Sequence, residues 1–237
     1  QGYPKPFSAA VTVASSVIGP VIPPSIPMVL YGALAEVSVG RLFMGGIVPG
    51  LLVGLSLMVL VYLYSRAKGF PKDPVVTRKE FFRRLGYAIL PGLTPVIILG
   101  GIIGGVFTPT EAASAAVFYA LILSLFVYRT VRLRDLPQIL VETMITTAIV
   151  TFVISAASSF SYLLLLSNIS QQIIEALTAL TTNKFLMLFI LNLILLFFGC
   201  IMEAGVALIL LVPILVPVLN AVGIDLIHFG VLMTDRK

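Results

Sequence analysis

The sequence has few of the residues on which metal centres, disulfides and enzyme active sites depend. It holds one cysteine, one histidine and no tryptophan in 237 residues. The lone Cys200 excludes an internal disulfide, and the lone His228 excludes a site built from several histidines. Neither an H-E-x-x-H nor a G-x-x-x-x-G-K-[ST] pattern occurs, and no Ser/His pair stands out. We therefore expect no enzyme and no transition metal.

Charged residues are also scarce, at 11% of the chain, whereas soluble domains carry about 25%. Hydrophobic residues make up 59%, and the mean hydropathy is +1.12. Runs such as Leu42 to Tyr64 contain no charge and exceed the roughly 20 residues that cross a bilayer. These runs are continuous rather than alternating, which excludes a β-barrel. The sequence predicts an all-α polytopic membrane protein.

The net charge of +5 does not indicate a nucleic-acid partner, because the basic residues concentrate in two short loops between apolar runs. The first, 65–86, has seven Lys and Arg against Asp73 and Glu80, and the second contains Arg129, Arg132 and Arg134. Cytoplasmic loops of membrane proteins carry this excess. We therefore expect segment 66–86 to be cytoplasmic and the lipid bilayer to be the surrounding partner.

The apolar runs divide the chain into three parts. Residues 1–34 form a broken transmembrane helix. Residues 35–86 comprise a linker to 41, a second transmembrane helix and a basic segment. The end of that segment predicts a short amphipathic helix at the membrane interface, with a solvated loop as the alternative. Residues 87–237 form the remainder.

Within this third part, the flanking basic loops require an even number of crossings between 88 and 128. Two crossings and a re-entrant hairpin that turns near 108–110 both remain open. A further span at 143–166 leads to an external linker at 167–183. The segment 184–222 predicts a helical hairpin with arms at 185–201 and 206–222 and the sequence CIMEAG at its tip.

The first apolar run contains four prolines in the stretch GPVIPPSIP, residues 19–27. Proline removes an N–H group and clashes with the preceding turn, so this stretch should unwind the helix. Unwound backbone inside a bilayer survives where protein buries it or where it lines a polar cavity. Its carbonyls and the hydroxyls of Ser15, Ser16 and Ser25 offer oxygen ligands for a hard cation such as Na⁺. A purely structural kink is the alternative.

Two further features carry candidate functional groups. Glu203, with Gly205 beside it, is an acid between two apolar arms, which favours a functional role; an ordinary surface loop is the alternative. In the stretch TPTEAA, Thr110 is expected to cap a helix and Glu111 to suit its positive end. A direct ligand role for Thr108, Thr110 and Glu111 is the alternative there.

Three stretches resemble the large membrane subunit of tripartite ATP-independent periplasmic (TRAP) transporters. They are IGPVIPPSIPMVLYG at 18–32, GGVFTPTEAASAAVFYAL at 104–121 and MEAGVALILLVPILVPVLNAVGIDLIHFGVLM at 202–233. They follow the family's order and extend over nearly the whole chain, which makes the combination far more specific than any one stretch.

The resemblance implies sodium-driven uptake of a small organic acid across a bacterial or archaeal cytoplasmic membrane. It implies two partners, a periplasmic substrate-binding protein and a small membrane subunit that is separate or fused. It also implies an elevator-type fold with inverted repeats, each contributing a hairpin and a broken helix. The positions carried over as Na⁺ and substrate contacts are Gly19, Pro23, Pro24, Ser25, Met202, Glu203, Ala204 and Gly205, with no cofactor beyond Na⁺.

The sequence departs from the family pattern at both ends. No hairpin precedes Gln1, and the chain stops at TDRK where an apolar helix and a second broken helix should follow. We therefore expect a fragment or a truncated product that does not transport alone. A non-transporting membrane scaffold or assembly subunit is the alternative function. The residues leave the substrate open among dicarboxylates, sugar acids and amino acids.

Overall fold

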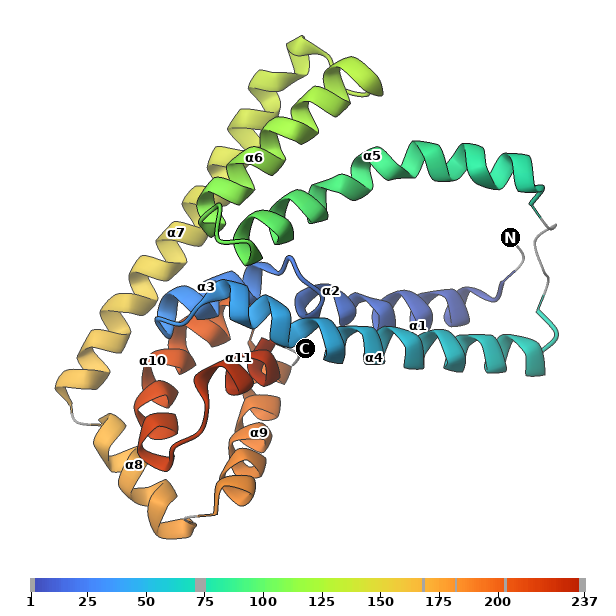
Figure 1. The fold of residues 1–237 in the computed structure, drawn as a ribbon. Helices are drawn as coiled ribbons and strands as arrows, with labels where there is room; N and C mark the ends of the chain where they lie inside the picture. Colours follow the sequence, from blue (N-terminus) through green and yellow to red (C-terminus); the bar gives the residue numbers. More distant parts are fainter. Residues whose placement is uncertain (1–2, 71–75, 168, 182, 203, 235–237) are drawn as a thin grey trace. The chain divides into compact units, whose positions relative to one another are not determined.

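The computed structural model describes residues 3–70, 76–167, 169–181, 183–202 and 204–234, and every regular element in these ranges is helical (Figure 1). The expected all-α fold class is confirmed. The α-helices are α1 (Lys5–Ser16), α2 (Ile18–Val21), α3 (Ile26–Leu34), α4 (Val39–Ala67), α5 (Arg78–Ile103), α6 (Pro109–Ile122), α7 (Leu136–Leu166), α8 (Ile169–Leu180), α9 (Lys184–Ile201), α10 (Ala204–Val222) and α11 (Leu226–Thr234); a π-helix, η1 (Leu123–Val127), and a 3₁₀ turn, η2 (Leu133–Asp135), complete them.

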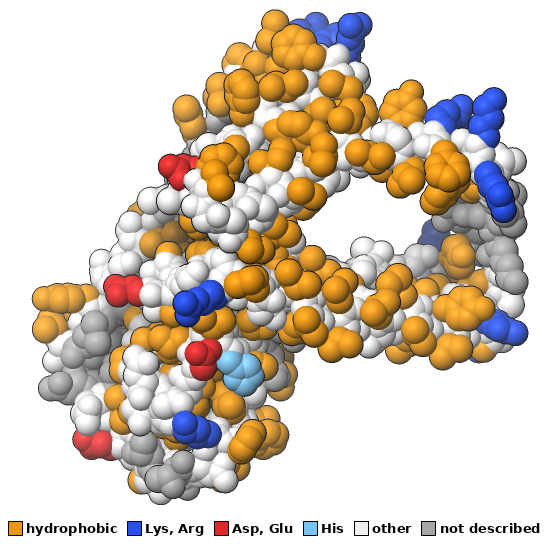
Figure 2. All heavy atoms as spheres, viewed as in Figure 1, with side chains coloured by type: hydrophobic (Ala, Val, Ile, Leu, Met, Phe, Trp, Pro, Cys, Tyr) orange, Lys and Arg blue, Asp and Glu red, His pale blue; other side chains and the backbone are white. Residues whose placement is uncertain are grey.

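Within the described ranges, seven helical segments are long and apolar enough to cross a membrane. They include Lys5–Leu34, which contains the proline break, and both arms of the expected hairpin, Lys184–Ile201 and Ala204–Val222. Figure 2 shows hydrophobic side chains along the length of the long helices, as contact with lipid requires. The chain is a multi-pass membrane protein.

The chain folds as two compact units. Unit 1 comprises residues 1–24 and 46–133, and unit 2 comprises residues 25–45 and 134–237. The chain passes between the units at the proline break, within α4 and just before α7. The proline break is therefore both a local interruption of a helix and a point at which the chain passes from one compact unit to the other.

In unit 1, α1 and α2 lie along α4, and glycines of α4 allow the close approach (Figure 1). A Cβ added at Gly50 would come within 2.6 Å of Ile22 Cγ1, and one at Gly54 within 3.9 Å of Ile18 Cδ1. These glycines belong to the small-xxx-small spacing that permits helices to pack in lipid.

The α5–α6 hairpin of unit 1 is held together by tyrosine hydroxyls. Pro91 lies inside α5 and cannot donate a hydrogen bond to the carbonyl of Tyr87, four residues earlier. The Tyr128 hydroxyl donates to that carbonyl at 2.6 Å, and the Tyr119 hydroxyl donates to the Leu90 carbonyl at 2.9 Å. The second arm thus satisfies the backbone that the proline leaves unpaired in the first.

In unit 2, α10 is the central helix, and α3, α7, α8, α9 and α11 all pack against it. Its buried side chains include Leu208, Val212 and Leu219. At the open end of the α9–α10 hairpin, the Lys184 ammonium donates to the Gly223 carbonyl at 2.9 Å. A cation at this point is also favoured by the negative end of the α10 dipole.

Two contacts fix α11 against α3 in the same unit. The Tyr31 hydroxyl donates to the Leu226 carbonyl at 2.7 Å. Beside it, Gly230 has no room for a side chain, because a Cβ there would overlap the Tyr31 ring and the Leu42 side chain. The start of α11 is itself capped by Asp225, whose carboxylate accepts from the His228 N–H at 2.8 Å.

Three boundaries differ from the sequence-based expectation. Helix α4 begins at Val39, so the expected 35–41 linker covers only 35–38. The basic segment after Thr77 is not a separate helix: it forms the first two turns of α5, which continues through Gly86 into the apolar part. The expected linker 167–183 contains α8, whose Ile173, Ile174 and Leu177 recur at helical spacing.

Candidate functional site

The proline break is shorter than the GPVIPPSIP stretch. Gly19 and Pro20 remain helical in α2. The interruption runs from Ile22 to Ser25, and α3 begins at the next residue, Ile26. Ser25 has extended backbone (φ −126°, ψ 124°), is 3% exposed and caps α3, its Oγ accepting from the Met28 N–H at 3.4 Å. The prediction that the prolines interrupt the helix is thus confirmed.

Of the other residues proposed on this side, Ser15, Ser16 and Gly19 lie outside the interruption. Ser15 and Ser16 belong to the last turn of α1, where their hydroxyls donate to the carbonyls of Thr12 (3.0 Å) and Val13 (2.8 Å). Both are exposed. Gly19 lies one turn further along, with open space where a side chain would project. Pro23 and Pro24 are within the interruption, the first buried and the second exposed.

The tip of the α9–α10 hairpin is a sharp turn. Helix α9 ends at Ile201, Met202 is extended (φ −113°, ψ 150°), and its N–H bonds to the Phe198 carbonyl at 2.8 Å. Helix α10 starts at Ala204, which places Gly205 in its first turn. Glu203 lies outside the described residues, so its proposed role stays a prediction.

A small cavity lies where these pieces meet in unit 2. Its volume is about 30 Å³, which suits one water-sized species. It is lined from α3 by Pro27, from the hairpin tip by Met202 and Ala204, and from the end of α11 by Met233 and Thr234; Leu195, Gly199, Ala207, Leu208 and Leu211 complete the wall. The fold thus brings the helix after the proline break beside the hairpin tip.

Three helix ends border this cavity. Pro27 and Ala204 belong to the first turns of α3 and α10, and Met202 directly follows the last turn of α9, while Thr234 of α11 is the last residue that the structure describes. Helix N-termini present N–H groups and partial positive charge, and C-termini present carbonyls and partial negative charge. The arrangement offers groups of both signs, taken from backbone rather than from charged side chains.

Thr234 is a polar residue of the cavity wall that the sequence motifs did not indicate. Its side chain is 4% exposed, and Oγ1 lies 3.0 Å from the carbonyls of both Gly230 and Val231, to which it can donate. A hydroxyl in an otherwise apolar helix is a recognisable signal, but in the sequence Thr234 belongs to the polar stretch TDRK, which departs from the family pattern.

The start of α6 belongs to unit 1 and serves a structural purpose. Thr108, not Thr110, is the capping residue: Pro109 suits the first helical position, which moves the cap one residue before it. The Glu111 carboxylate accepts from the Thr108 N–H (2.7 Å) and hydroxyl (2.8 Å), while Thr108 Oγ1 accepts from the Glu111 N–H (3.3 Å). This is a complete capping box.

Residues 1–234 match the protein family described as "Tripartite ATP-independent periplasmic transporter, DctM component". The chain is similar to the sialic acid TRAP transporter large permease protein SiaM of Vibrio cholerae, at 43% identity over 97% of this chain and 54% of the relative. It is 42% identical to the C4-dicarboxylate TRAP transporter large permease protein DctM of Pseudomonas aeruginosa, over 98% of this chain and 55% of the relative.

A further relative is the isethionate TRAP transporter permease protein DctMQ of Oleidesulfovibrio alaskensis, 44% identical over 98% of this chain and 37% of the relative. The chain spans about half the length of SiaM and DctM, and less of DctMQ. Both the family match and the identities extend over nearly all of its residues, so the chain belongs to the DctM family of TRAP transporter large permeases.

Proposed function

We propose that this chain is part of the large membrane subunit of a sodium-coupled transporter in a bacterial cytoplasmic membrane. The transporter takes up a small organic acid from a periplasmic binding protein and works with a small membrane subunit. The observation that supports this most is the meeting of the start of α3, the hairpin tip and α11 at one cavity. Discontinuous helices that meet in this way characterise ion and substrate sites of secondary transporters.

We assign the cavity to the coupling ion rather than to the substrate. Its volume of about 30 Å³ is well below the roughly 300–1,000 Å³ of typical ligand pockets. Na⁺ prefers oxygen ligands, which the Thr234 hydroxyl in the cavity wall and the carbonyls at the end of α9 can supply. The Ser25 hydroxyl, two residues before the wall residue Pro27, is a further candidate.

The names of the relatives support an acidic substrate. Sialic acid, C4-dicarboxylates and isethionate all carry a carboxylate or a sulfonate. Because the chain spans about half the length of these relatives, we propose the activity for a transporter that contains this chain, the remaining sequence of its relatives and both partner proteins.

Ser25 provides the sharpest test of the ion site, because two substitutions separate its roles. Ser25→Ala removes both the hydroxyl ligand and the helix cap, whereas Ser25→Gly removes the hydroxyl and costs the cap only a few tenths of a kcal/mol. If Ser25 binds Na⁺, both variants need a higher Na⁺ concentration for half-maximal uptake, by about tenfold for one lost charge-assisted contact of about 1.4 kcal/mol. Initial uptake rates into proteoliposomes at graded Na⁺ measure this.

The matched control is Ser16→Ala, which removes an exposed hydroxyl of α1 and should leave the Na⁺ dependence unchanged. A Ser25→Gly variant with normal Na⁺ dependence would show that Ser25 acts only as a cap. Uptake that does not respond to a Na⁺ gradient in the unsubstituted transporter would refute sodium coupling itself.

A further inference from the structure

The first two turns of α5 form a basic and aromatic surface that the transport proposal leaves without a role. Four basic side chains, Arg78, Lys79, Arg83 and Arg84, accompany one acidic residue, Glu80. Figure 2 shows Lys and Arg side chains gathered at this end of α5. Phe81 and Phe82 stack edge to face at 5.6 Å between ring centres, and both are largely exposed.

The length of α5 places this surface at the level of the lipid headgroups. The uncharged part of the helix, 85–103, is about 28 Å long at 1.5 Å per residue, close to the roughly 30 Å of a hydrocarbon core. The preceding residues 78–84 add about 10 Å, which exceeds the polar layer of one leaflet, about 5–8 Å. Arg83 and Arg84, which adjoin the uncharged part of the helix, therefore lie in this polar layer, within reach of the lipid phosphates.

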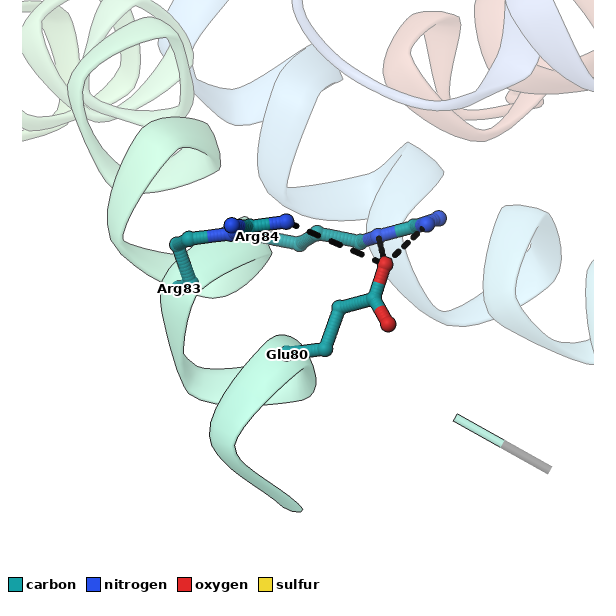
Figure 3. A network of polar contacts seen from close by, with 3 residues as sticks. All are labelled: Glu80, Arg83 and Arg84. Atoms are coloured by element: carbon teal, nitrogen blue, oxygen red, sulfur yellow. Dashed lines mark hydrogen bonds and ion pairs between the residues drawn. The ribbon is translucent and has the colours of Figure 1, made fainter. Parts of the chain in front are cut away.

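Glu80 holds both arginines in one arrangement (Figure 3). Its Oε1 accepts from Arg84 Nε at 3.1 Å and from Arg84 Nη2 at 2.5 Å, and lies 3.9 Å from Arg83 Nη2. The arginine side chains are still 70% and 69% exposed, so most of their five N–H donors point to the surroundings. Two guanidinium groups gathered round one carboxylate present an organised set of donors for a phosphate.

We propose that Arg83 and Arg84, positioned by Glu80, bind the phosphate of an anionic phospholipid, with the Phe81–Phe82 pair in the headgroup layer beside them. The excess of basic over acidic groups favours an anionic lipid over a zwitterionic one, since clusters of basic residues beside a membrane span attract anionic headgroups. Aromatic rings commonly occupy the same interfacial layer. The proposal depends on the span assignment of α5 and not on transport.

The absence of tryptophan from the sequence permits a direct test with the full chain. Tyr87→Trp places a single fluorophore about one turn from Arg83 and Arg84, at an exposed position. The reporter protein is reconstituted into phosphatidylcholine vesicles containing equal amounts of either brominated phosphatidylglycerol or brominated phosphatidylcholine, because bromine quenches tryptophan on contact. We expect quenching by the anionic lipid to be at least about threefold stronger.

Combining Arg83→Gln with Arg84→Gln should reduce this ratio to about one. The matched control, Arg129→Gln with Arg134→Gln, removes the same charge from the second basic loop and should leave the ratio unchanged. Equal quenching by the two lipids in the reporter protein would overturn the proposal, and so would an equal loss in the control pair. Abolition of the preference by about 10 mM inorganic phosphate would show a free-anion site instead and would also overturn it.

Discussion

The α5–α6 and α9–α10 hairpins share a sequence feature but use it in different surroundings. Each carries two prolines four residues apart in one arm, Pro91 and Pro95 in α5 and Pro213 and Pro217 in α10. In the first hairpin, tyrosines of the opposite arm bond the backbone near the prolines, and a capping box closes the turn. In the second, the proline arm is the central helix of its unit, and the turn borders a cavity.

The turns of the two hairpins differ in how their polar groups are satisfied and in what surrounds them. The Thr108–Glu111 turn satisfies its polar groups with hydrogen bonds of its own. The Met202 turn lies beside Pro27 of α3 and Thr234 of α11, with which it borders a small cavity. The two turns therefore differ in their surroundings, and the ion-site proposal depends on the surroundings of the second.

The largest expected effect comes from filling the cavity at the second hairpin. Ala207→Leu adds three carbon atoms to the wall of a cavity of about 30 Å³ and should exclude the ion. We expect the sodium-dependent uptake rate to fall by roughly 10–100-fold, as for a loss of about 1.4–2.8 kcal/mol of ion binding. Uptake into proteoliposomes under a Na⁺ gradient measures the change. The matched substitution at the first hairpin, Ala113→Leu, falls on an exposed position and should leave the rate unaltered. A normal rate in Ala207→Leu would remove the cavity from the mechanism.

A smaller effect should come from a difference in how tightly a glycine is packed in each unit. Gly230→Ala forces a Cβ against Tyr31 and Leu42 and endangers the Tyr31 hydrogen bond, so we expect a loss of about 1–3 kcal/mol in the free energy of unfolding. Gly100→Ala in α5 meets no neighbour and should stabilise the helix by about 0.5–1 kcal/mol. Unfolding titrations in SDS compare the two, and equal effects would contradict the difference in packing.

The smallest effect concerns the tyrosine that compensates for Pro91. Tyr128→Phe leaves the Tyr87 carbonyl without its hydroxyl donor and should cost about 1 kcal/mol of unfolding free energy. Tyr62→Phe, which removes an exposed hydroxyl of α4, is the control and should change the same titration little. If Tyr128→Phe changed the unfolding free energy as little as its control does, the unpaired backbone at Pro91 would not need the Tyr128 hydroxyl.

Local chemistry accounts for what the sequence could predict. Prolines interrupt helices wherever they occur in number, and uncharged runs of span length become helices in lipid, so the break after α2 and both arms of the α9–α10 hairpin were predictable. The scarcity of Lys and Arg in 167–183 indicates an external linker but says nothing of its secondary structure; helix α8 is indicated instead by apolar residues that recur at helical spacing.

The composition of the cavity wall could not be predicted in the same way. Thr234 joins Met202 and Pro27 through tertiary packing, since α11 is positioned by Tyr31 and Gly230 at places far apart in the sequence. Ser15 and Ser16 were assigned to the ion site by proximity in sequence, whereas their hydroxyls bond within α1. Thr108 and Thr110 flank Pro109, and because Pro109 takes the first helical position of α6, Thr108 is the cap.

The Lys184–Gly223 hydrogen bond has a mechanical consequence for the second hairpin. The arms are joined covalently at the Met202 end and are tied at the opposite end by this contact. Two rods connected at both ends cannot splay apart unless one connection breaks. While this bond persists, the arms stay joined at the end opposite Met202, so a motion that opens the cavity has to bend the arms or move them together.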